Sequence, residues 1–302
     1  MIRRIARSFY LRYQLKKMLA NGLPSKLATP LLYLVGQNKL TAEDRAVVEK
    51  IESIRTNIAE KGEEQIQSYY TPPPGSAGNE LSETLRITPG EVNIVSMERI
   101  AYGTSIPRDW GTFLYLCANA TQAKTILELG SCAGISGAYM AAGQYCQQFI
   151  TIEGSPPLSK LAESSIGQVT ENFTVVNAIF DDGLDRVIPT LNNGLDMVWI
   201  DGHHEKIATI HYFQRLIPYL NEGCLVLFDD TSWSHDMQEA WEKLAHWDGF
   251  SHAVDLVKCG LCIWDGNVKK PSKVWDFPIY PKKIGVPRGW LKLYNFKEQK
   301  KT

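Results

Sequence analysis

The stretch that decides the fold is TILELGSCAGISG, residues 125–137. It opens with a short apolar run interrupted only by Glu128, and it breaks into small residues around Gly130 and Gly134. The chain then continues as AYMAAGQYC, a segment of helical composition. A strand, a tight glycine turn and the start of a helix together form a nucleotide-binding corner in α/β proteins. The sequence therefore predicts a ligand-binding turn here.

From residue 125 onward, strand-like and helix-like segments alternate. The apolar, strand-like runs are 125–129, 148–152, 173–177, 195–200 and 223–228. Helix-like segments separate them at 134–146, 156–168, 182–190 and 205–220, and one more follows at 234–246. This alternation predicts a parallel sheet with helices on both faces. The last two runs, HAVDLV and LCIW, are joined by KCG, which is too short for a helical crossover, so we expect a hairpin and an antiparallel last strand.

The residues before this region are predicted to be mainly helical. Residues 2–20 form a basic helix, and a capping box from Thr41 to Asp44 precedes apolar residues at helical spacing. Further helices are expected from Thr88, which is followed by Pro89, and near 108–120.

The Pro/Gly stretch at 69–80 marks a boundary. We expect three parts: a helical extension or cap (1–100), a ligand-binding domain (101–265) and a basic, aromatic tail (266–302).

Composition is that of a globular protein, with 44% hydrophobic and 22% charged residues among 302. No apolar run approaches the ~18 residues that span a membrane. The six cysteines are scattered through apolar segments without a recognisable secretory signal, which predicts reduced thiols in a cytoplasmic protein. Cys259 and Cys262 have C-x-x-C spacing but lack a second pair, so buried strand cysteines are favoured over zinc ligands.

Charge is distributed unevenly along the chain. Residues 1–42 carry eight Lys/Arg and no acid, and residues 265–302 carry ten Lys/Arg against three acids. Both ends are interleaved with aromatic residues, a pattern that suits contact with anionic membrane headgroups. The alternative, which we favour, is that both ends pack on the acidic middle of the chain or on a second subunit, forming a homodimer. A small-molecule partner is expected, and no nucleic acid.

Three ligands compete for the glycine turn: a dinucleotide, a nucleoside triphosphate and S-adenosylmethionine (SAM). The dinucleotide fingerprint needs a glycine where Cys132 stands, and the triphosphate loop needs a Lys that is missing. An acid at Glu128 suits a ligand with an ammonium group. Glu153 ends the next strand, where a carboxylate can accept both hydroxyls of a ribose. SAM has both groups and no pyrophosphate.

The segments ELGSCAGISGAYMA and ITIEG resemble the class I SAM-dependent methyltransferases, nearest the catechol- and caffeoyl-CoA-type O-methyltransferases and their bacterial relatives. The resemblance covers about residues 100–265. It implies a Rossmann-like sheet of seven strands in the order 3-2-1-4-5-7-6, with the last strand antiparallel. It also implies transfer of a methyl group to a small hydroxylated molecule.

The resemblance further implies roles for individual residues. Those near the methionine part of SAM would be Gly130, Ser131, Cys132, Gly134, Ile135 and Ser136. Glu153, with Gly154 after it, would hold the ribose. Ala178, Ile179 and His203 would flank the adenine.

Acidic residues end two further strands, in WIDGHHEK and LFDDTSW. The carboxylates of Asp201, Asp229 and Asp230 are expected to converge, and a hard divalent cation such as Mg²⁺ would relieve their repulsion. In the metal-dependent enzymes of the resembling family, three such positions bind the metal. The alternative is that Asp229 and Asp230 cap the following turn and that Asp201 holds a backbone amide.

A base is needed to deprotonate a hydroxyl acceptor. The catechol-type enzymes carry a lysine three residues after the position of Asp201, and His204 stands there in this chain. A histidine titrates near neutral pH and suits the role. We therefore expect His204 to be the base, assisted by Asp201, with Lys206 as the alternative.

Two other functions compete with methyl transfer. An NAD(P)-dependent oxidoreductase would also use a Rossmann sheet, but Cys132 and the antiparallel hairpin argue against it. A non-catalytic scaffold with the same fold is the second alternative, and the intact glycine turn and the acidic residues argue against that.

Overall fold

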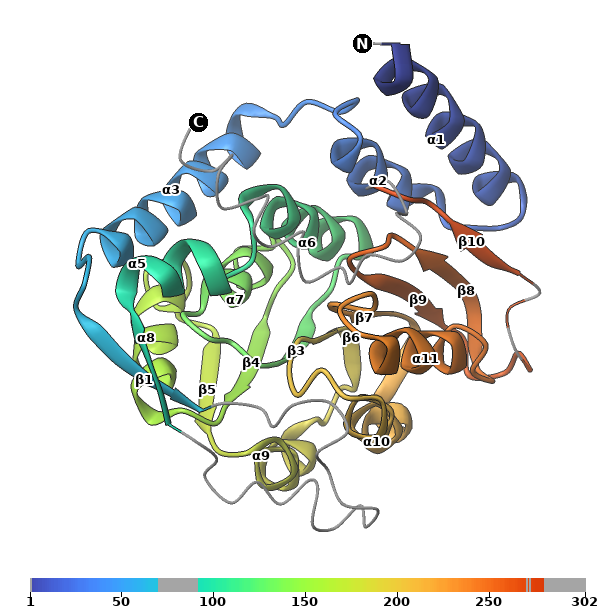
Figure 1. Ribbon diagram of the computed structural model, residues 1–302. Coiled ribbons are helices and arrows are strands. Elements are labelled where there is room, and N and C mark those ends of the chain that lie inside the picture. Colours follow the sequence, from blue (N-terminus) through green and yellow to red (C-terminus); the bar gives the residue numbers. More distant parts are fainter. Residues whose placement is uncertain (1, 70–91, 270, 272, 280–302) are drawn as a thin grey trace.

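The core of the protein is an eight-stranded sheet. The computed structural model describes residues 2–69, 92–269, 271 and 273–279 (Figure 1). The strands of the sheet are β3 (Thr125–Leu129), β4 (Gln148–Glu153), β5 (Phe173–Asn177), β6 (Leu195–Ile200), β7 (Leu220–Phe228), β8 (Phe250–Asp255), β9 (Gly260–Trp264) and β10 (Val274–Asp276). Their order is β10-β8-β9-β7-β6-β3-β4-β5. Neighbouring strands are parallel except at β9, which is antiparallel to both β7 and β8.

The predicted order of seven strands is confirmed by the run β8-β9-β7-β6-β3-β4-β5. β10 was not predicted, and it extends the sheet by pairing in parallel with β8. Its three residues lie in the basic tail, where lysines and a proline surround a very short apolar segment. The strand is anchored by Trp275 and by Phe277 just beyond it, both of which are buried. Tertiary packing therefore makes a strand that local sequence does not indicate.

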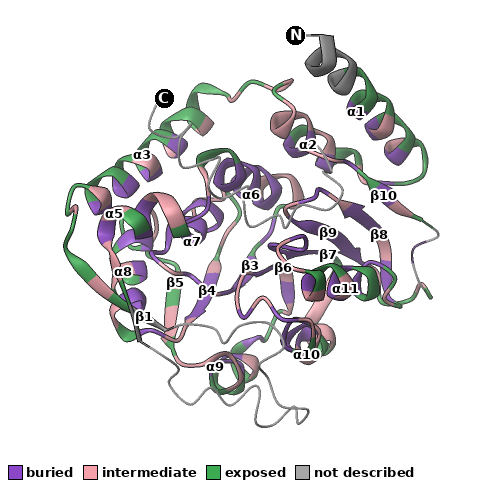
Figure 2. Ribbon diagram, in the orientation of Figure 1, coloured by how far each residue is buried: buried purple, intermediate pink, exposed green. Residues whose placement is uncertain are grey.

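Helices cover both faces of the sheet, as predicted. One face carries α6 (Arg108–Thr121), α7 (Ile135–Ala141) and α8 (Pro156–Ile166), and the other carries α9 (Phe180–Val187), α10 (Lys206–Leu216) and α11 (His235–Leu244). Successive strand residues face opposite sides, so in β3 Ile126 joins one core and Leu127 the other. Figure 2 shows central strands such as β3 buried between these two layers, whereas the edge strand β5 is only partly buried.

The N-terminal helices pack on the body of the protein and share its core. They are α1 (Ile2–Ala20), α2 (Ala28–Leu34) and α3 (Ala42–Ala59). The predicted capping box is confirmed at the start of α3, where Asp44 N donates to Thr41 Oγ1 at 3.0 Å and Thr41 N donates to Asp44 Oδ2 at 3.2 Å. Buried side chains of all three helices belong to the same apolar cluster as α6 and α7. The division into an extension and a binding domain stays a prediction.

An ionic network fastens α3 to the segment before α6. The Arg55 side chain is 2% exposed and forms an ion pair with Glu52 at 3.0 Å. Its guanidinium also donates to Ala101 O at 2.7 Å and to Ile106 O at 2.6 Å. Glu52 Oε1 in turn accepts from the Tyr139 hydroxyl of α7 at 2.8 Å. The extension is thus tied to the helix that follows the glycine turn.

Two sequence predictions need correction. The helix expected from Thr88 begins outside the described residues, and residues 92–96 form a strand instead. This strand, β2 (Val92–Ser96), pairs antiparallel with β1 (Gln65–Tyr69). A short helix, α5 (Met97–Arg99), and a π-helical turn at Ile100–Thr104 follow. The helix expected at 134–146 ends at Ala141, because the chain turns at Gly143 to enter β4.

In the described parts of the chain, no helix is long and apolar enough to cross a membrane. All six cysteines have free thiols, as predicted. Cys259 and Cys262 are both buried, and burial raises the pKa of each thiol well above its ordinary value. Such thiols behave as small apolar side chains.

Candidate functional site

The predicted functional residues gather where the central parallel strands end. A series of backbone hydrogen bonds continues past those ends and links neighbouring strand termini. Gly130 N donates to Ile152 O at 3.0 Å, and Asp201 N donates to Leu129 O at 2.9 Å. Asp229 N donates to Ile200 O at 2.9 Å, and Thr231 N donates to Lys258 O at 3.1 Å. Open α/β sheets bind ligands at this carboxyl edge.

The glycine turn is packed too tightly for any other residue. Gly130 has φ of +95°, and a Cβ there would lie 2.0 Å from Asp201 O. Gly134 has φ of +76°, and a Cβ there would lie 2.6 Å from the Ala162 Cα. Both positions combine left-handed backbone with contact against a neighbouring element, which only glycine permits. The turn is therefore held close to β6 on one side and to α8 on the other.

Strained backbone is concentrated at the same edge. Among the described residues, six non-glycine residues have positive φ, and five of them lie at strand ends of this site: Cys132 (+48°), His203 (+65°), His204 (+28°), Asp230 (+48°) and Val257 (+78°). A left-handed conformation is unusual for such residues and most unusual for a β-branched valine. Backbone strain of this kind clusters at functional sites, where surrounding structure maintains it.

Glu153 sits at the end of β4 beside the glycine turn. Its Oε2 accepts from Cys132 N and its Oε1 from Ser155 N, both at 2.9 Å. Burial raises the pKa of Glu153, and these backbone donors oppose that rise. Each carboxylate oxygen can accept a second hydrogen bond, so the group could hold a diol as well as the turn. Ser131 Oγ beside it is buried and makes no hydrogen bond with the described residues.

Glu128 lies on the inner side of the turn rather than on its open side. The residue is 0% exposed, and its Oε1 accepts from Ser136 Oγ at 2.5 Å. Burial raises the pKa of Glu128 to about 8, against hydrogen bonds that lower it. The carboxyl thus keeps its proton to higher pH than an ordinary glutamate does. Its side chain faces Ser136 and not the open side of the turn, and its predicted contact with a ligand's ammonium stays a prediction.

The remaining cofactor candidates differ in exposure. Gly134, Ile135 and Ser136 are buried, whereas Cys132 and Gly154 are partly exposed. Ala178 and Ile179 follow β5 and are half-buried, and Ala178 N donates to Glu153 O at 3.2 Å. This bond sets the loop after β5 beside Glu153, where the adenine was predicted to lie.

His203 is buried next to aromatic side chains after β6. Its Nδ1 forms a hydrogen bond with the Tyr212 hydroxyl at 2.9 Å, while its Nε2 has no hydrogen-bond partner among the described residues. The ring of Phe180 packs edge-on against Tyr212, with centroids 5.2 Å apart. Burial, reinforced by the charge of His204, lowers the pKa of His203 to about 4. The ring is therefore neutral and presents one unused nitrogen.

The two candidate bases point to different partners. His204 Nε2 lies 3.7 Å from Asp201 Oδ1, and both side chains are about a quarter exposed. Lys206 instead pairs with Glu239 of α11, while its backbone N donates to Asp236 Oδ2 at 2.5 Å. The hydrogen bond that Lys206 Nζ donates to Glu239 raises the pKa of Lys206. Lys206 thus stays charged and is paired with α11, whereas His204 lies near Asp201, so the geometry favours His204.

The paired acids after β7 hold a lysine. Lys258 Nζ donates to Asp229 Oδ1 at 2.5 Å, to Asp229 Oδ2 at 2.7 Å and to Asp230 Oδ1 at 3.2 Å. The side chains of Asp229 and Asp230 are only 5% and 9% exposed, and that of Lys258 is 14% exposed. Burial alone lowers the pKa of Lys258, but the neighbouring carboxylates outweigh it and hold this pKa well above its ordinary value. The lysine is therefore a fixed cation.

The metal site that the sequence predicts at Asp201, Asp229 and Asp230 stays a prediction. Within the described residues, no group of three His, Cys, Asp or Glu side chains is arranged to hold a metal ion. The ammonium of Lys258 lies between Asp229 and Asp230, where a bound cation would sit. Sequence reasoning missed this lysine. The signal was present: Lys258 is the one charged residue in KCGLCIW, between two apolar strands whose turn reaches the carboxyl edge.

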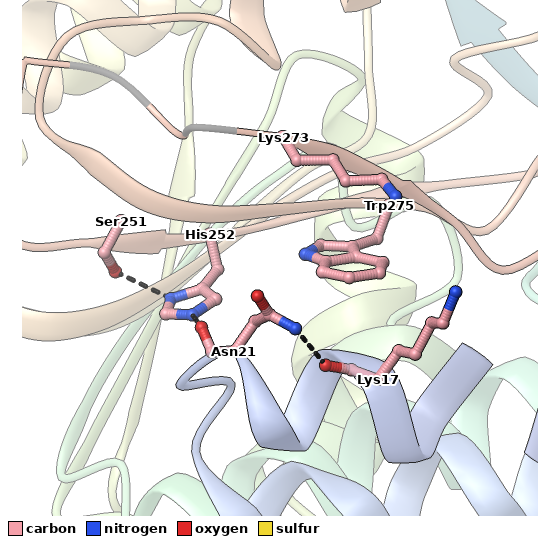
Figure 3. Close-up of a pocket in the computed structure, with 6 residues that line it drawn as sticks. All are labelled: Lys17, Asn21, Ser251, His252, Lys273 and Trp275. Atoms are coloured by element: carbon pink, nitrogen blue, oxygen red, sulfur yellow. Dashed lines mark hydrogen bonds between the residues drawn. The ribbon is translucent and has the colours of Figure 1, made fainter. Parts of the chain in front are cut away.

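A separate cavity of about 360 Å³ lies at the other end of β8, far along the strand from the turn that carries Lys258. Figure 3 shows His252 between Ser251 and the end of α1, with hydrogen bonds to Ser251 Oγ at 3.1 Å and Asn21 O at 3.3 Å. The cavity is lined by Lys17, Asn21, Ser251, His252, Lys273 and Trp275. None of these residues belongs to the strand-end site.

Comparison with known proteins supports the interpretation of the central region. Residues 127–231 match the model of a family described as a methyltransferase domain. A catechol O-methyltransferase from Niastella koreensis is 31% identical over 129 residues, which span 42% of this chain and 58% of that enzyme. One from Mycobacterium tuberculosis is 31% identical over 122 residues, spanning 40% of this chain and 54% of that enzyme.

The chain thus spans little more than half the length of these curated relatives. An O-methyltransferase from Bacillus cereus, solved in complex with S-adenosylhomocysteine (SAH), has a TM-score of 0.48 and 19% identity, covering 53% of this chain and 83% of that one. Residues 127–231 thus resemble a methyltransferase domain, and the predicted resemblance to the catechol-type enzymes is confirmed. The glycine turn, Glu153, Asp201 and the paired acids all lie inside the matched range.

Proposed function

We propose that the protein is a SAM-dependent methyltransferase that methylates a hydroxyl of a small molecule. The observation that carries this proposal is the shared edge of β3, β4 and β6. There a glycine turn, the carboxylate of Glu153 and a histidine–aspartate pair meet within one methyltransferase domain. The catechol O-methyltransferases that the chain resembles support oxygen as the acceptor atom.

The residues at the turn suit SAM as the cofactor. Ser131 Oγ and His203 Nε2 are buried polar atoms without a hydrogen-bond partner among the described residues, an arrangement that costs stability unless a ligand satisfies them. Glu153 would accept from the ribose hydroxyls, with Ala178 and Ile179 beside the adenine. Gly130 and Gly134 hold the tight turn beside which the methionine part would bind. When bound, SAM supplies a methyl group on a positively charged sulfur, and the electron pair of the breaking C–S bond stays on that sulfur.

His204 is assigned the role of general base. In this role the imidazole takes the proton of the acceptor hydroxyl, and the oxygen then attacks the methyl carbon. Asp201 lies 3.7 Å from the ring nitrogen and would stabilise the imidazolium that forms. The remainder of the acceleration comes from holding the acceptor oxygen in line with the methyl group, which can supply up to ~7–11 kcal/mol.

Metal assistance was part of the sequence prediction and is not part of this proposal. A Mg²⁺ ion on Asp201, Asp229 and Asp230 would chelate the acceptor and lower its hydroxyl pKa. Two of those three acids already bind the ammonium of Lys258, so the residues present do not fit a divalent cation. The mechanism is therefore written without one.

Methyl transfer itself provides the test. The purified chain would be incubated with methyl-labelled SAM and a panel of catechols, phenols, sugars and amines, and labelled product would be measured. We expect transfer to at least one hydroxylated compound. Transfer only to amines would replace the oxygen acceptor by nitrogen. No transfer despite tight SAH binding would favour the alternative of a non-catalytic scaffold, and binding of NAD(P) in place of SAH would favour an oxidoreductase.

Peripheral membrane contact, a homodimer and a cytoplasmic location stay predictions. The outer side of α1 exposes Phe9 (66%), Tyr10 (45%) and Tyr13 (55%), and Lys17 lies over the Tyr13 ring at 4.6 Å. An aromatic and basic helix face of this kind favours anionic lipid or a second protein surface. Co-sedimentation with anionic liposomes at low salt separates them, because only lipid contact sediments the protein.

A further inference from the structure

We propose that Lys258 permanently takes the place of a divalent cation at the acidic cluster formed by Asp201, Asp229 and Asp230. In this proposal the methyltransferase works without a metal. The proposal rests on the proposed function for the role of the cluster, but the position of the lysine is independent of it. Lys258 Nζ lies 2.5 to 3.2 Å from three oxygens of Asp229 and Asp230. A metal ion bridging the same two carboxylates would need the same space.

The lysine is placed by its own backbone and not by a mobile side chain alone. Lys258 O accepts from Thr231 N at 3.1 Å, which ties the hairpin turn to the residue after the paired acids. Val257 is fully buried with φ of +78°, and its N donates to Asp255 Oδ1 at 2.7 Å. A buried valine in left-handed backbone is a strained arrangement that the turn maintains. The structure thus directs one ammonium into the cluster.

Charge accounts for the exclusion of a metal. The acids of the cluster carry a charge that requires a partner, and a hydrogen-bonded ammonium meets that need for Asp229 and Asp230. A divalent ion entering the cluster would face this fixed positive charge at a few ångströms, where like charges repel strongly. Mg²⁺ also demands near-octahedral oxygen ligands, and Lys258 already uses three of the oxygens that would supply them.

Lys258 acts through the acids and is a positioning residue in the proposed reaction. It holds the carboxylate of Asp229. The backbone N of Asp229 donates to Ile200 O at the end of β6, so Asp229 lies beside the strand end that Asp201 follows. It also adds positive charge near the oxygen that would become negative as the acceptor loses its proton. A divalent ion performs both tasks in a metal-dependent site.

Binding of Mn²⁺ tests the proposal without any acceptor. The full chain, stripped of metal with a chelator, would be titrated with Mn²⁺ while the electron paramagnetic resonance signal of free Mn²⁺ is recorded. We expect no stoichiometric binding by the wild type. The Lys258→Met variant keeps most of the side-chain volume but lacks the charge. It should bind one Mn²⁺ per chain at least about tenfold more tightly than the wild type.

Controls make each outcome decisive. The Lys243→Met variant removes a lysine from α11 and should behave as the wild type does. Combining Lys258→Met with Asp229→Asn should abolish the new site. Tight one-to-one Mn²⁺ binding by the wild type would overturn the proposal, even if Lys258→Met failed to fold. A folded Lys258→Met variant with unchanged Mn²⁺ affinity would overturn it too. SAH titration of the same samples reports separately on the proposed function.

Discussion

Arg55 and Lys258 are two shielded cations with contrasting partners. The guanidinium of Arg55 donates to Glu52 and to two backbone carbonyls, Ala101 O and Ile106 O. The hydrogen bonds of the Lys258 ammonium go to carboxylate oxygens alone among the described residues. A cation that binds carbonyls fixes the path of the chain, whereas one that binds side-chain acids compensates their charge. The first cluster therefore supports the fold, and the second belongs to the site.

The largest expected effect is on turnover, and it comes from a residue of the strand-end site. Replacing the proposed base in the His204→Asn variant should lower turnover by ~10²–10⁴-fold, the range typical of a lost general base. Asparagine tolerates the positive φ at this position, so the backbone should keep its course. Turnover would be measured at saturating SAM together with SAH affinity, which should not change. The His235→Asn variant changes an 86% exposed side chain and provides the control. Unchanged turnover in His204→Asn would remove the histidine from the mechanism.

Removing the guanidinium of Arg55 should lower the stability of the folded protein rather than its turnover. The Arg55→Met variant is expected to lose about 3–5 kcal/mol of unfolding free energy, because it leaves Glu52 and two carbonyls without their donor. Urea denaturation followed by circular dichroism would measure the loss. Lys50→Met, on the exposed side of the same helix, should stay within about 0.5 kcal/mol of the wild type. A loss below about 1 kcal/mol for Arg55→Met would contradict the structural role.

The buried acid beneath the glycine turn gives a pH-dependent prediction. Because burial raises the pKa of Glu128 to about 8 from an ordinary value of 4.5, the native state keeps a proton that the unfolded chain releases between those values. Stability contributed by this group therefore falls as pH rises from about 4.5 to 8. The Glu128→Gln variant does not titrate. As pH rises across that window, its unfolding free energy should increase relative to that of the wild type by up to about 5 kcal/mol, at about 1.4 kcal/mol per pKa unit.

Urea denaturation at a series of pH values would follow that difference. The Glu163→Gln variant, which changes an exposed acid on α8, should run parallel to the wild type. Parallel curves for Glu128→Gln itself would show that Glu128 is ionised in the folded protein.

The smallest effect concerns cofactor affinity alone. In the Glu153→Gln variant one oxygen becomes an amide that can no longer accept from both the turn and a ribose hydroxyl. Losing one charge-assisted hydrogen bond should weaken SAH binding by about tenfold. Calorimetry would measure this, with Glu163→Gln again as the control. Equal affinity would show that Glu153 serves only to brace Cys132 N, as it does in this structure.

Much of the sheet could be predicted because its strands are mostly apolar runs separated by helical segments. β10 and the β1–β2 pair could not, since each is short and depends on a partner remote in sequence. The direction of Glu128 was also beyond prediction, because both faces of a central parallel strand are buried and alternation carries little information. The positions of the site residues at strand ends could be predicted from the topology of the sheet. The partner of Asp229 could not, because it depends on where the hairpin turn places the side chain of Lys258.

The central claim is that the turn at Gly130 binds SAM, and calorimetric titration of SAH into the purified chain tests it most directly. We predict one-to-one binding at micromolar concentration, lost in a Gly130→Ala variant whose Cβ would collide with Asp201 O. Binding that survives this substitution would place the cofactor elsewhere. Absence of binding by the wild type would contradict the account and remove the basis for the methyltransferase assignment.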